Sequence, residues 1–219
     1  MITLALDAST YRGTVAVFDE SRLLVQDSAP MRGRDAELLM PAVLQALANA
    51  GITLGQLDRV VCGSGPGSFT SLRIAASIAK GVAVGRGVPL YAVSSLALIV
   101  AGNVSDGPRG ARKYLAVLDA MRRESYVAEF EHDAGAVRPL GGHRVVSSTD
   151  VMAVAEGAGA RAVGPEMPDQ WHPHARGVGL LLEQFEADPV DVASWEPTYG
   201  RLAEAQVKWE AEQGRALSP

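Results

Sequence analysis

The sequence predicts an α/β protein made of two similar halves, each with the order β-β-β-α-β-α. Three observations support this fold class. Two short apolar runs, residues 2–6 and 114–118, both end in an Asp-Ala pair and both lead through a polar turn into a second β-rich run. Residues 102–112 between the halves have the Gly, Asn, Ser and Pro content of a linker. Strand patterns alternate with helical ones in each half, which is typical of sheets with crossover helices.

In the first half we expect strands at residues 2–6, 14–18, 23–25, 60–62 and 90–93. We expect helices at residues 35–50, 68–84 and 95–101. The first helix contains Pro41, which predicts either a kink or a helix that starts near Met40. Gly51 is placed to end that helix, because glycine readily adopts the left-handed conformation of a C-terminal cap.

In the second half we expect strands at residues 114–118, 125–130 and 161–163, and one more between 137 and 146. Helices are expected at residues 149–156 and 178–187. Residues 202–212 have an apolar face, which predicts an amphipathic helix docked on the body of the protein. The resulting domain limits are 1–102 for the first half, 112–195 for the smaller second half, and 196–219 for a docking helix and tail.

Composition excludes several classes of protein. The 219 residues suffice for a hydrophobic core, and the net charge of -5 without a basic cluster argues against unaided binding to nucleic acid. Cys62 is the single cysteine, so no disulfide can form within the chain, and its place in an apolar strand predicts a buried, inert thiol. With no basic leader and no apolar run of membrane-spanning length, we expect a soluble cytoplasmic protein.

The helix at residues 68–84 is unusually apolar. Between Leu72 and Val84 its only charges are Arg73 and Lys80, which lie seven residues apart on one narrow stripe. The remaining face is wider than the stripe of about 100° that a surface helix buries. Either other elements of this chain cover it, or a helix of another subunit does. Its small residues would let a second helix approach closely, and they are Ala75, Ala76, Ala79 and Ala83.

The glycine-rich loop at residues 63–67 precedes this helix and could cradle an anion at the helix N-terminus. It matches neither the P-loop nor the dinucleotide-binding pattern, so glycines for a tight turn are the stronger interpretation. Asp7, Ser9 and Thr10 could hold a metal ion or stabilise the hairpin as an Asx turn. His132, His143, His172 and His174 fall in expected loops without zinc-ligand spacing. No complete catalytic set occurs in the sequence.

The most specific motifs are Gly65-Pro66-Gly67-Ser68-Phe69-Thr70-x-Leu72-Arg73-Ile74 and Leu6-Asp7-Ala8-Ser9. Others are Leu38-Leu39-Met40-Pro41, Val93-Ser94-Ser95-Leu96, Asp119-Ala120 and Pro197-x-Tyr199-Gly200-Arg201. With these motifs the chain resembles the TsaB (YeaZ) family over nearly its whole length. The resemblance implies the actin-like ATPase fold, with two ribonuclease-H-like halves, and a non-catalytic role in making threonylcarbamoyladenosine at position 37 of tRNA.

The resemblance also implies partners. The catalytic paralogue TsaD and the ATPase TsaE are expected in a complex, with a homodimer of the free chain as a further possibility and tRNA contacted only indirectly. Catalytic relatives carry two metal-binding histidines where this chain has Ser95 and Ile99, so neither metal nor cofactor is expected. The implied partner interface consists of Leu38, Leu39, Ala42, Leu72, Arg73, Ala75, Ala76, Ala79, Lys80 and Ala83. A vestigial nucleotide or anion site would use Asp7, Ser9, Thr10, Gly65 and Gly67.

Two alternatives compete with this scaffold hypothesis. The chain could retain a weak ATPase or a metallopeptidase-like activity of the actin-like superfamily. Asp7, Asp119 and the glycine-rich loop would then form its active site. It could also bind tRNA directly, which its acidic balance argues against.

Overall fold

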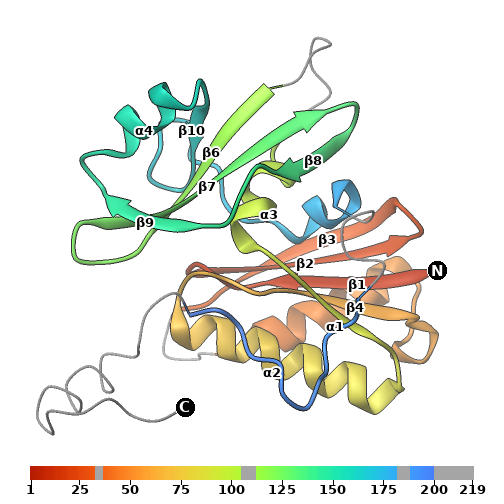
Figure 1. Ribbon diagram of the computed structural model, residues 1–219. Coiled ribbons are helices and arrows are strands. Elements are labelled where there is room, and N and C mark those ends of the chain that lie inside the picture. Colours follow the sequence, from red (N-terminus) through yellow and green to blue (C-terminus); the bar gives the residue numbers. More distant parts are fainter. Residues whose placement is uncertain (33–36, 105–111, 182–187, 200–219) are drawn as a thin grey trace, which may run out of the picture.

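The computed structural model describes residues 1–32, 37–104, 112–181 and 188–199, which form two five-stranded sheets in successive halves of the chain (Figure 1). The first sheet has the order β3-β2-β1-β4-β5. Its strands are β1 (Ile2–Asp7), β2 (Arg12–Asp19), β3 (Arg22–Pro30), β4 (Arg59–Gly63) and β5 (Leu90–Val93). β1, β2 and β3 pair antiparallel, whereas β4 and β5 continue the sheet in parallel with β1. The hairpin-led first half is therefore confirmed, with a third strand longer than expected.

The helices of the first half are α1 (Leu39–Ala50), α2 (Phe69–Arg86) and α3 (Ser95–Ala101), with a short 3-10 helix η1 (Leu54–Gln56). α1 starts beside Met40, so the alternative of a late start is confirmed. Pro41 lies in the first turn, where its missing N–H group is not needed by the helix. The carboxylate of Glu37 accepts the N–H groups of Leu39 and Met40 at 2.8 and 3.1 Å and so caps the helix. The expected opening at Asp35 lies outside the described residues.

The second sheet has the order β10-β6-β7-β8, with β9 also paired to β7. Its strands are β6 (Arg112–Asp119), β7 (Glu124–Asp133), β8 (Ala136–Pro139), β9 (Arg144–Ser147) and β10 (Arg161–Val163). The helix α4 (Val151–Gly157) connects β9 to β10. As in the first half, an antiparallel hairpin is extended by a parallel strand, which agrees with the predicted duplication.

Three expectations for the second half need correction. The single third strand is divided into β8 and β9, because the glycine pair at 141–142 and the turn around it interrupt the run. The helix expected at 178–187 is a 3-10 helix, η2 (Ala175–Leu180), where Gly177 and Gly179 weaken α-helix propensity, and residues 182–187 lie outside the described residues. His132 lies on β7 and not in a loop. The helix expected at 202–212 also lies outside the described residues, and the domain limits stay a prediction.

β1, β2 and β4 of the first sheet are buried on both faces, as their almost continuous apolar runs require, whereas β3 at the edge is only partly buried. Side chains alternate between the faces, so Leu4 and Leu6 of β1 pack toward α1 and α2, while Ala5 faces α3 and the second half. α3 is buried along its whole length between the two sheets (Figure 1). Cys62 is fully buried on the α1 and α2 side, as expected, and burial raises the pKa of its thiol. In the described parts of the chain, no helix is long and apolar enough to cross a membrane.

Candidate functional site

The inner face of α2 is covered by this chain itself. Leu72, Ala75 and Ala79 have no exposed surface, and Ala83 is 1% exposed, because this face packs on β4 and β1 of the first sheet. Ala76 is also buried, as are Leu39 and Ala42 of α1. Of the residues that the sequence suggested for a partner interface, only Leu38 and Arg73 are exposed, and Lys80 is half-buried. Ala75, Ala79 and Ala83 belong to the apolar core between α2 and the sheet, so the predicted role of these alanines in a partner interface stays a prediction.

A second flank of α2 is covered by residues 188–199, which we call the strap (Figure 1). One end of the strap is held where the Val190 N–H donates to the carbonyl oxygen of Leu90 at 2.8 Å. In its middle, the Trp195 ring lies 5.8 Å from the Lys80 ammonium. At the other end, the Thr198 N–H donates to the Ser64 carbonyl oxygen at 2.7 Å. The strap therefore runs back along α2, and no sequence pattern predicted this cover.

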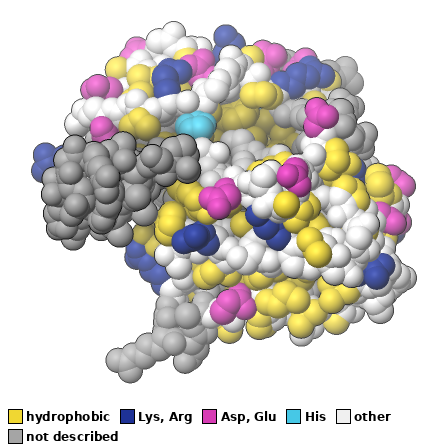
Figure 2. Space-filling model, turned by 60° about the horizontal axis from the view of Figure 1, so that its bottom comes forward, with side chains coloured by type: hydrophobic (Ala, Val, Ile, Leu, Met, Phe, Trp, Pro, Cys, Tyr) yellow, Lys and Arg dark blue, Asp and Glu magenta, His cyan; other side chains and the backbone are white. Residues whose placement is uncertain are grey.

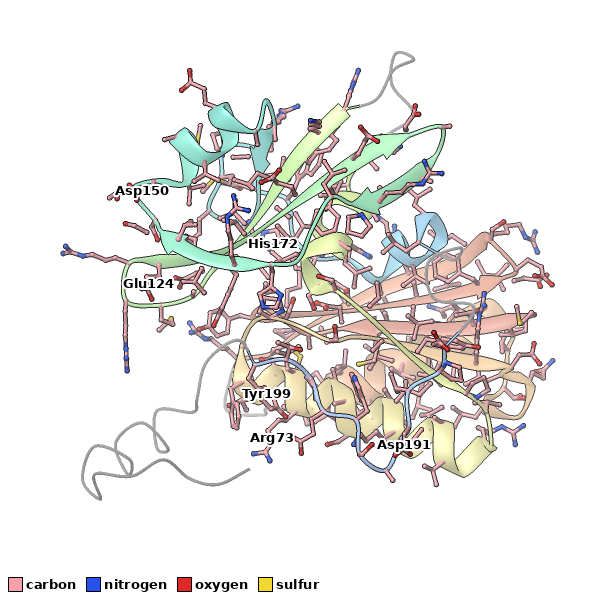
Figure 3. The ribbon with its side chains drawn as sticks, in the orientation of Figure 1. Arg73, Glu124, Asp150, His172, Asp191 and Tyr199 are labelled. Carbon is pink, nitrogen blue, oxygen red and sulfur yellow. The ribbon has the colours of Figure 1, made fainter. Side chains whose placement is uncertain are left out.

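The strap ends in an aromatic cluster at the N-terminal end of α2. The rings of Phe69 and Tyr199 are 4.6 Å apart between centroids, and the Arg73 guanidinium lies 4.9 Å from the Phe69 centroid. Arg73 also acts on the pKa of Tyr199, which it lowers against the larger rise caused by burial. Figure 3 shows Arg73 and Tyr199 at the same end of α2, with Asp191 of the strap toward the other end. Of the two charges that the sequence placed on one stripe, Lys80 lies by the Trp195 ring of the strap, and Arg73 lies by the Phe69 ring that the strap residue Tyr199 contacts.

The outer face of α2 remains open to solvent. It carries small residues at a spacing of four, Ser77, Gly81 and Gly85, and beside them Val84, which is 69% exposed. A Cβ atom built on Gly81 or Gly85 would meet no other atom within 4 Å. We call these four residues the open stripe. The sequence analysis missed the open stripe because it took the alanines of this helix as the residues that a second helix would approach. The spacing of Ser77, Gly81 and Gly85 is itself a signal for close helix approach.

α1 also presents large apolar side chains to solvent. Leu38, just before α1, is 41% exposed, and Leu44 is 48% exposed. A groove of about 440 Å³ lies along the first half of α2, and its lining is Glu37, Phe69, Thr70, Arg73, Ile74, Ser77 and Ile78. In Figure 2, which brings this underside forward, hydrophobic side chains gather across the lower part of the molecule with few charges between them. Such a surface is typical of a contact with another protein.

The predicted anion site around Asp7 is closed by the chain itself. One carboxylate oxygen of Asp7 accepts hydrogen bonds from the Ser9 N–H and hydroxyl at 3.0 and 2.8 Å, and the other accepts the Ser95 hydroxyl at 2.5 Å. Burial raises the pKa of Asp7, and these hydrogen bonds oppose the rise. A Cβ atom on Gly63 would overlap the Asp7 carboxylate. The close packing favours the tight-turn interpretation of the glycine-rich loop.

The other residues of that predicted site differ in what surrounds them. Gly67 lies against the Ser9 backbone and Gly65 lies under Thr198 of the strap. Ser9, Thr10 and Gly67 line the cleft between the two halves, whereas Gly65 does not. An anion site at these residues stays a prediction. In the described segments, no group of three His, Cys, Asp or Glu side chains is arranged to hold a metal ion.

A cleft of about 930 Å³ separates the two halves. Its walls come from the turn after β1, the turn after β6, the first residues of β7, and the segment before η2. His172 lies between the two sheets (Figure 3), and its Nδ1 atom is buried without a hydrogen-bond partner among the described residues. Burial, and to a lesser degree Arg12, lower the pKa of His172, while burial and Asp119 raise that of Tyr126. Both groups are therefore neutral near pH 7, so the cleft offers polar but uncharged atoms at this point.

Comparison with known proteins identifies the family. A family model described as TsaD, tRNA N6-adenosine threonylcarbamoyltransferase, matches residues 34–173, well over half of the chain. YeaZ from Pseudomonas aeruginosa superposes with a TM-score of 0.75 at 26% identity, over 90% of this chain and 99% of that chain. The chain belongs to the TsaB (YeaZ) family. The chain shares the fold of that YeaZ structure, and the actin-like ATPase fold stays what the resemblance implies.

Curated TsaB relatives support this assignment. The Escherichia coli protein named tRNA threonylcarbamoyladenosine biosynthesis protein TsaB is 31% identical over 137 residues, which are 63% of this chain and 58% of that protein. The Bacillus subtilis protein of the same name is 26% identical over 231 residues, covering 95% of this chain and 98% of that protein. The chain thus spans little more than half the length of the first of these TsaB proteins and nearly all of the second.

Two positions on α3 distinguish this TsaB-family chain from the pattern expected of catalytic relatives. Ser95 and Ile99 stand where we expect metal-binding histidines in those relatives, and neither has any exposed surface. The Ser95 hydroxyl donates to Asp7 and accepts the Gly65 N–H at 3.0 Å. Ile99 is part of the apolar core between the sheets. Both positions serve the internal structure of the TsaB-family fold in this chain.

The pH dependence of stability is expected to report on His174, which caps η2. Its Nδ1 atom accepts the Arg176 N–H at 3.2 Å, and burial, followed by Arg176 and Arg12, lowers its pKa to about 4. In the unfolded chain, His174 takes up a proton near pH 6.5, whereas in the folded chain it stays neutral down to about pH 4. Between these pH values protonation favours the unfolded state, so the stability of the fold decreases as the pH drops from 6.5 to about 4. Allowing for the part of the ring that water reaches, we expect a loss of roughly 1 to 2 kcal/mol over that range.

The measurement is urea unfolding at several pH values for the wild type and for His174→Asn, whose side-chain oxygen can still accept the Arg176 N–H. Asp7 has a raised pKa, so its contribution falls as the pH rises, but it is present in both proteins and cancels in their difference. The variant should lose less stability on acidification than the wild type. Parallel curves for the two proteins would contradict the role given to His174.

Proposed function

We propose that this chain acts in the biosynthesis of tRNA threonylcarbamoyladenosine in the cytoplasm, as a non-catalytic scaffold that pairs with a TsaD-type catalytic subunit. The names of its TsaB relatives support the pathway. The observation that carries the scaffold role is the open stripe on α2. Among the described residues, a Cβ atom on either of its glycines would meet nothing within 4 Å, and the neighbouring Val84 is exposed, as are Leu38 and Leu44 at α1. A partner helix laid on this face would bury the apolar side chains and approach the glycines closely.

The proposed interface is the exposed surface of α1 and α2, and so it differs from the set that the sequence suggested. Leu38 and Arg73 are retained from that set because they are exposed. The interface gains the open stripe and Leu44. The buried positions Leu39, Ala42, Leu72, Ala75, Ala76, Ala79 and Ala83 support the interface from behind, and Lys80 holds the strap. In the same proposal, the ATPase TsaE joins the pair, the free chain forms a homodimer through the same face, and tRNA is contacted only through the assembly.

The non-catalytic role rests on the chemistry around Asp7. A carboxylate that accepts three hydrogen bonds from its own chain and has no exposed surface is poorly placed to hold a hydrated metal ion. Ser95 and Ile99, at the positions expected for metal ligands, are a hydroxyl engaged with Asp7 and a hydrocarbon side chain. These features support a subunit that assembles the enzyme without performing its chemistry.

The specific observation that favours the alternative, a weak ATPase or metallopeptidase-like enzyme, is the cleft between the halves. Its volume is in the range of small-molecule sites. Titration calorimetry of the purified chain with ATP and magnesium tests this alternative directly. We expect no binding tighter than the millimolar range, and a micromolar dissociation constant would favour the enzyme over the scaffold.

Co-purification tests the scaffold itself. The full chain and the TsaD-type subunit of the same organism are produced together with a tag on one of them and analysed by size-exclusion chromatography. We expect a stable complex, and threonylcarbamoylation of tRNA only when both chains are present. Separate elution of the two chains at micromolar concentrations would contradict the proposal.

A further inference from the structure

Arg73 is an exposed cation that lines the groove at the N-terminal end of α2. Its guanidinium lies over the Phe69 ring, 4.9 Å from the centroid, and the Phe69 and Tyr199 rings contact each other. An arginine stacked on aromatic rings has already lost much of its side-chain freedom. A partner that binds it therefore gives up less conformational entropy than it would on a free surface arginine.

The guanidinium has no carboxylate within ion-pair distance in the described parts of the chain. Glu37 lines the same groove, but its carboxylate accepts the first N–H groups of α1. Burial and the nearby Glu196 raise the pKa of Tyr199, yet Glu196 forms no ion pair with Arg73. The Phe69 ring contacts the face of the guanidinium, so most of the five N–H donors at its edge remain available.

Docking on the open stripe would take this cation out of water. Arg73, Ile74, Ser77 and Ile78 line one groove, and Ser77 also belongs to the open stripe, so a helix laid on the stripe covers the groove. Burying a charge without an opposite charge is costly, whereas a charge-assisted hydrogen bond to a carboxylate offsets the loss of hydration. The surface therefore favours a partner that places a carboxylate side chain next to Arg73.

We propose that Arg73 receives an aspartate or glutamate side chain of the subunit that docks on α1 and α2, with the aliphatic part of that side chain against Ile74 and Ile78. This inference rests on the proposed function, because it takes the docking subunit to be the TsaD-type paralogue. It adds the chemistry of the contact. Arginines at the centre of an interface are frequent binding hot spots, and Arg73 lies between the apolar groove and the rigid Phe69 and Tyr199 pair.

The test is the dissociation constant of the full chain and the TsaD-type subunit, measured by calorimetry at about 50 mM and about 500 mM salt. Removing the charge with Arg73→Gln should weaken binding by roughly tenfold to a hundredfold at low salt and remove most of the salt dependence. Arg73→Lys keeps the charge but cannot make the forked contact, so it should bind with intermediate affinity and retain the salt dependence. Arg138→Gln removes an exposed arginine on β8, away from α2, and should change neither quantity.

The outcomes separate this inference from the proposed function. If the wild type binds and Arg73→Gln binds equally well, or keeps the full salt dependence, the carboxylate contact is wrong while the scaffold stands. If the wild type does not bind at all, both are wrong. The unfolding free energy of each variant is measured in parallel. If Arg73→Gln disturbs the fold, Arg73→Lys provides the test: intermediate affinity supports the carboxylate contact, and wild-type affinity contradicts it.

Discussion

Replacing Gly81 with arginine is expected to abolish pairing with the TsaD-type subunit while the chain stays folded. Gly81 lies at the centre of the open stripe, and a Cβ atom built there meets no atom of the described residues within 4 Å. The new side chain therefore extends into the space that a partner helix would occupy, and it brings a charge into an apolar contact. We expect the dissociation constant to rise at least about a hundredfold, which corresponds to roughly 2.7 kcal/mol. The unfolding free energy should change by less than about 1 kcal/mol, because arginine favours the helix over glycine.

The measurement is binding by calorimetry together with urea unfolding of the same preparations. Gly157→Arg is the matched control, since Gly157 is also a helical glycine with open space around it but lies on α4 in the second half. It should leave pairing unchanged. Ala79→Arg is the opposite control, because Ala79 is fully buried and the charge should unfold α2 rather than block a partner. Full pairing of a folded Gly81→Arg protein would remove the open stripe from the interface.

Replacing Gly65 with alanine is expected to cost about 3 to 5 kcal/mol of stability. The backbone of Gly65 has a φ of 86°, which a residue with a Cβ atom rarely adopts. The added Cβ would also overlap the carbonyl oxygen of Thr198 and lie 3.0 Å from a methyl carbon of Leu72. The neighbouring peptide is held by the bond from the Thr198 N–H to Ser64, so relief of the overlap requires the strap to move from the loop.

Gly51→Ala is the control that isolates the steric part of this effect. Gly51 has a similar positive φ of 68° at the end of α1, but a Cβ atom there meets nothing within 4 Å. It should lose only about 1 kcal/mol, the usual cost of the left-handed conformation for alanine. Urea unfolding of both variants provides the comparison. An equal loss for the two would show that the contact between the strap and the loop contributes little to stability.

Local patterns were sufficient for most of the fold. The apolar run of β1, the polar turn after it and the next β-rich run predicted the hairpin. Pro41 predicted a kink or a start of the helix near Met40, and the second is what the structure has, because both features depend on neighbours in the sequence. The pattern failed at η2, where two glycines disfavour an α-helix, and at β8 and β9, where one apolar stretch proved to be two short strands. In both places the segment is short and tertiary contacts decide its form.

The candidate interface was predicted less well than the fold. Apolar content correctly marked α2 as a helix covered on more than one side, but it could not distinguish the alanines that pack on the sheet from the glycines that face solvent. The strap shows the reason. Trp195 and Tyr199 lie more than a hundred residues from Lys80 and Arg73, and no periodicity relates them.

What the sequence by itself determined is the two-halved α/β architecture, the buried thiol of Cys62 and the resemblance to the TsaB family, because periodicity and motifs are carried by residues close together in the chain. Only the tertiary structure decided which side of α2 is free, since that depends on the sheet and the strap arriving from distant parts of the chain. It also showed that Asp7 is satisfied by Ser9 and Ser95, a matter of three side chains meeting in space.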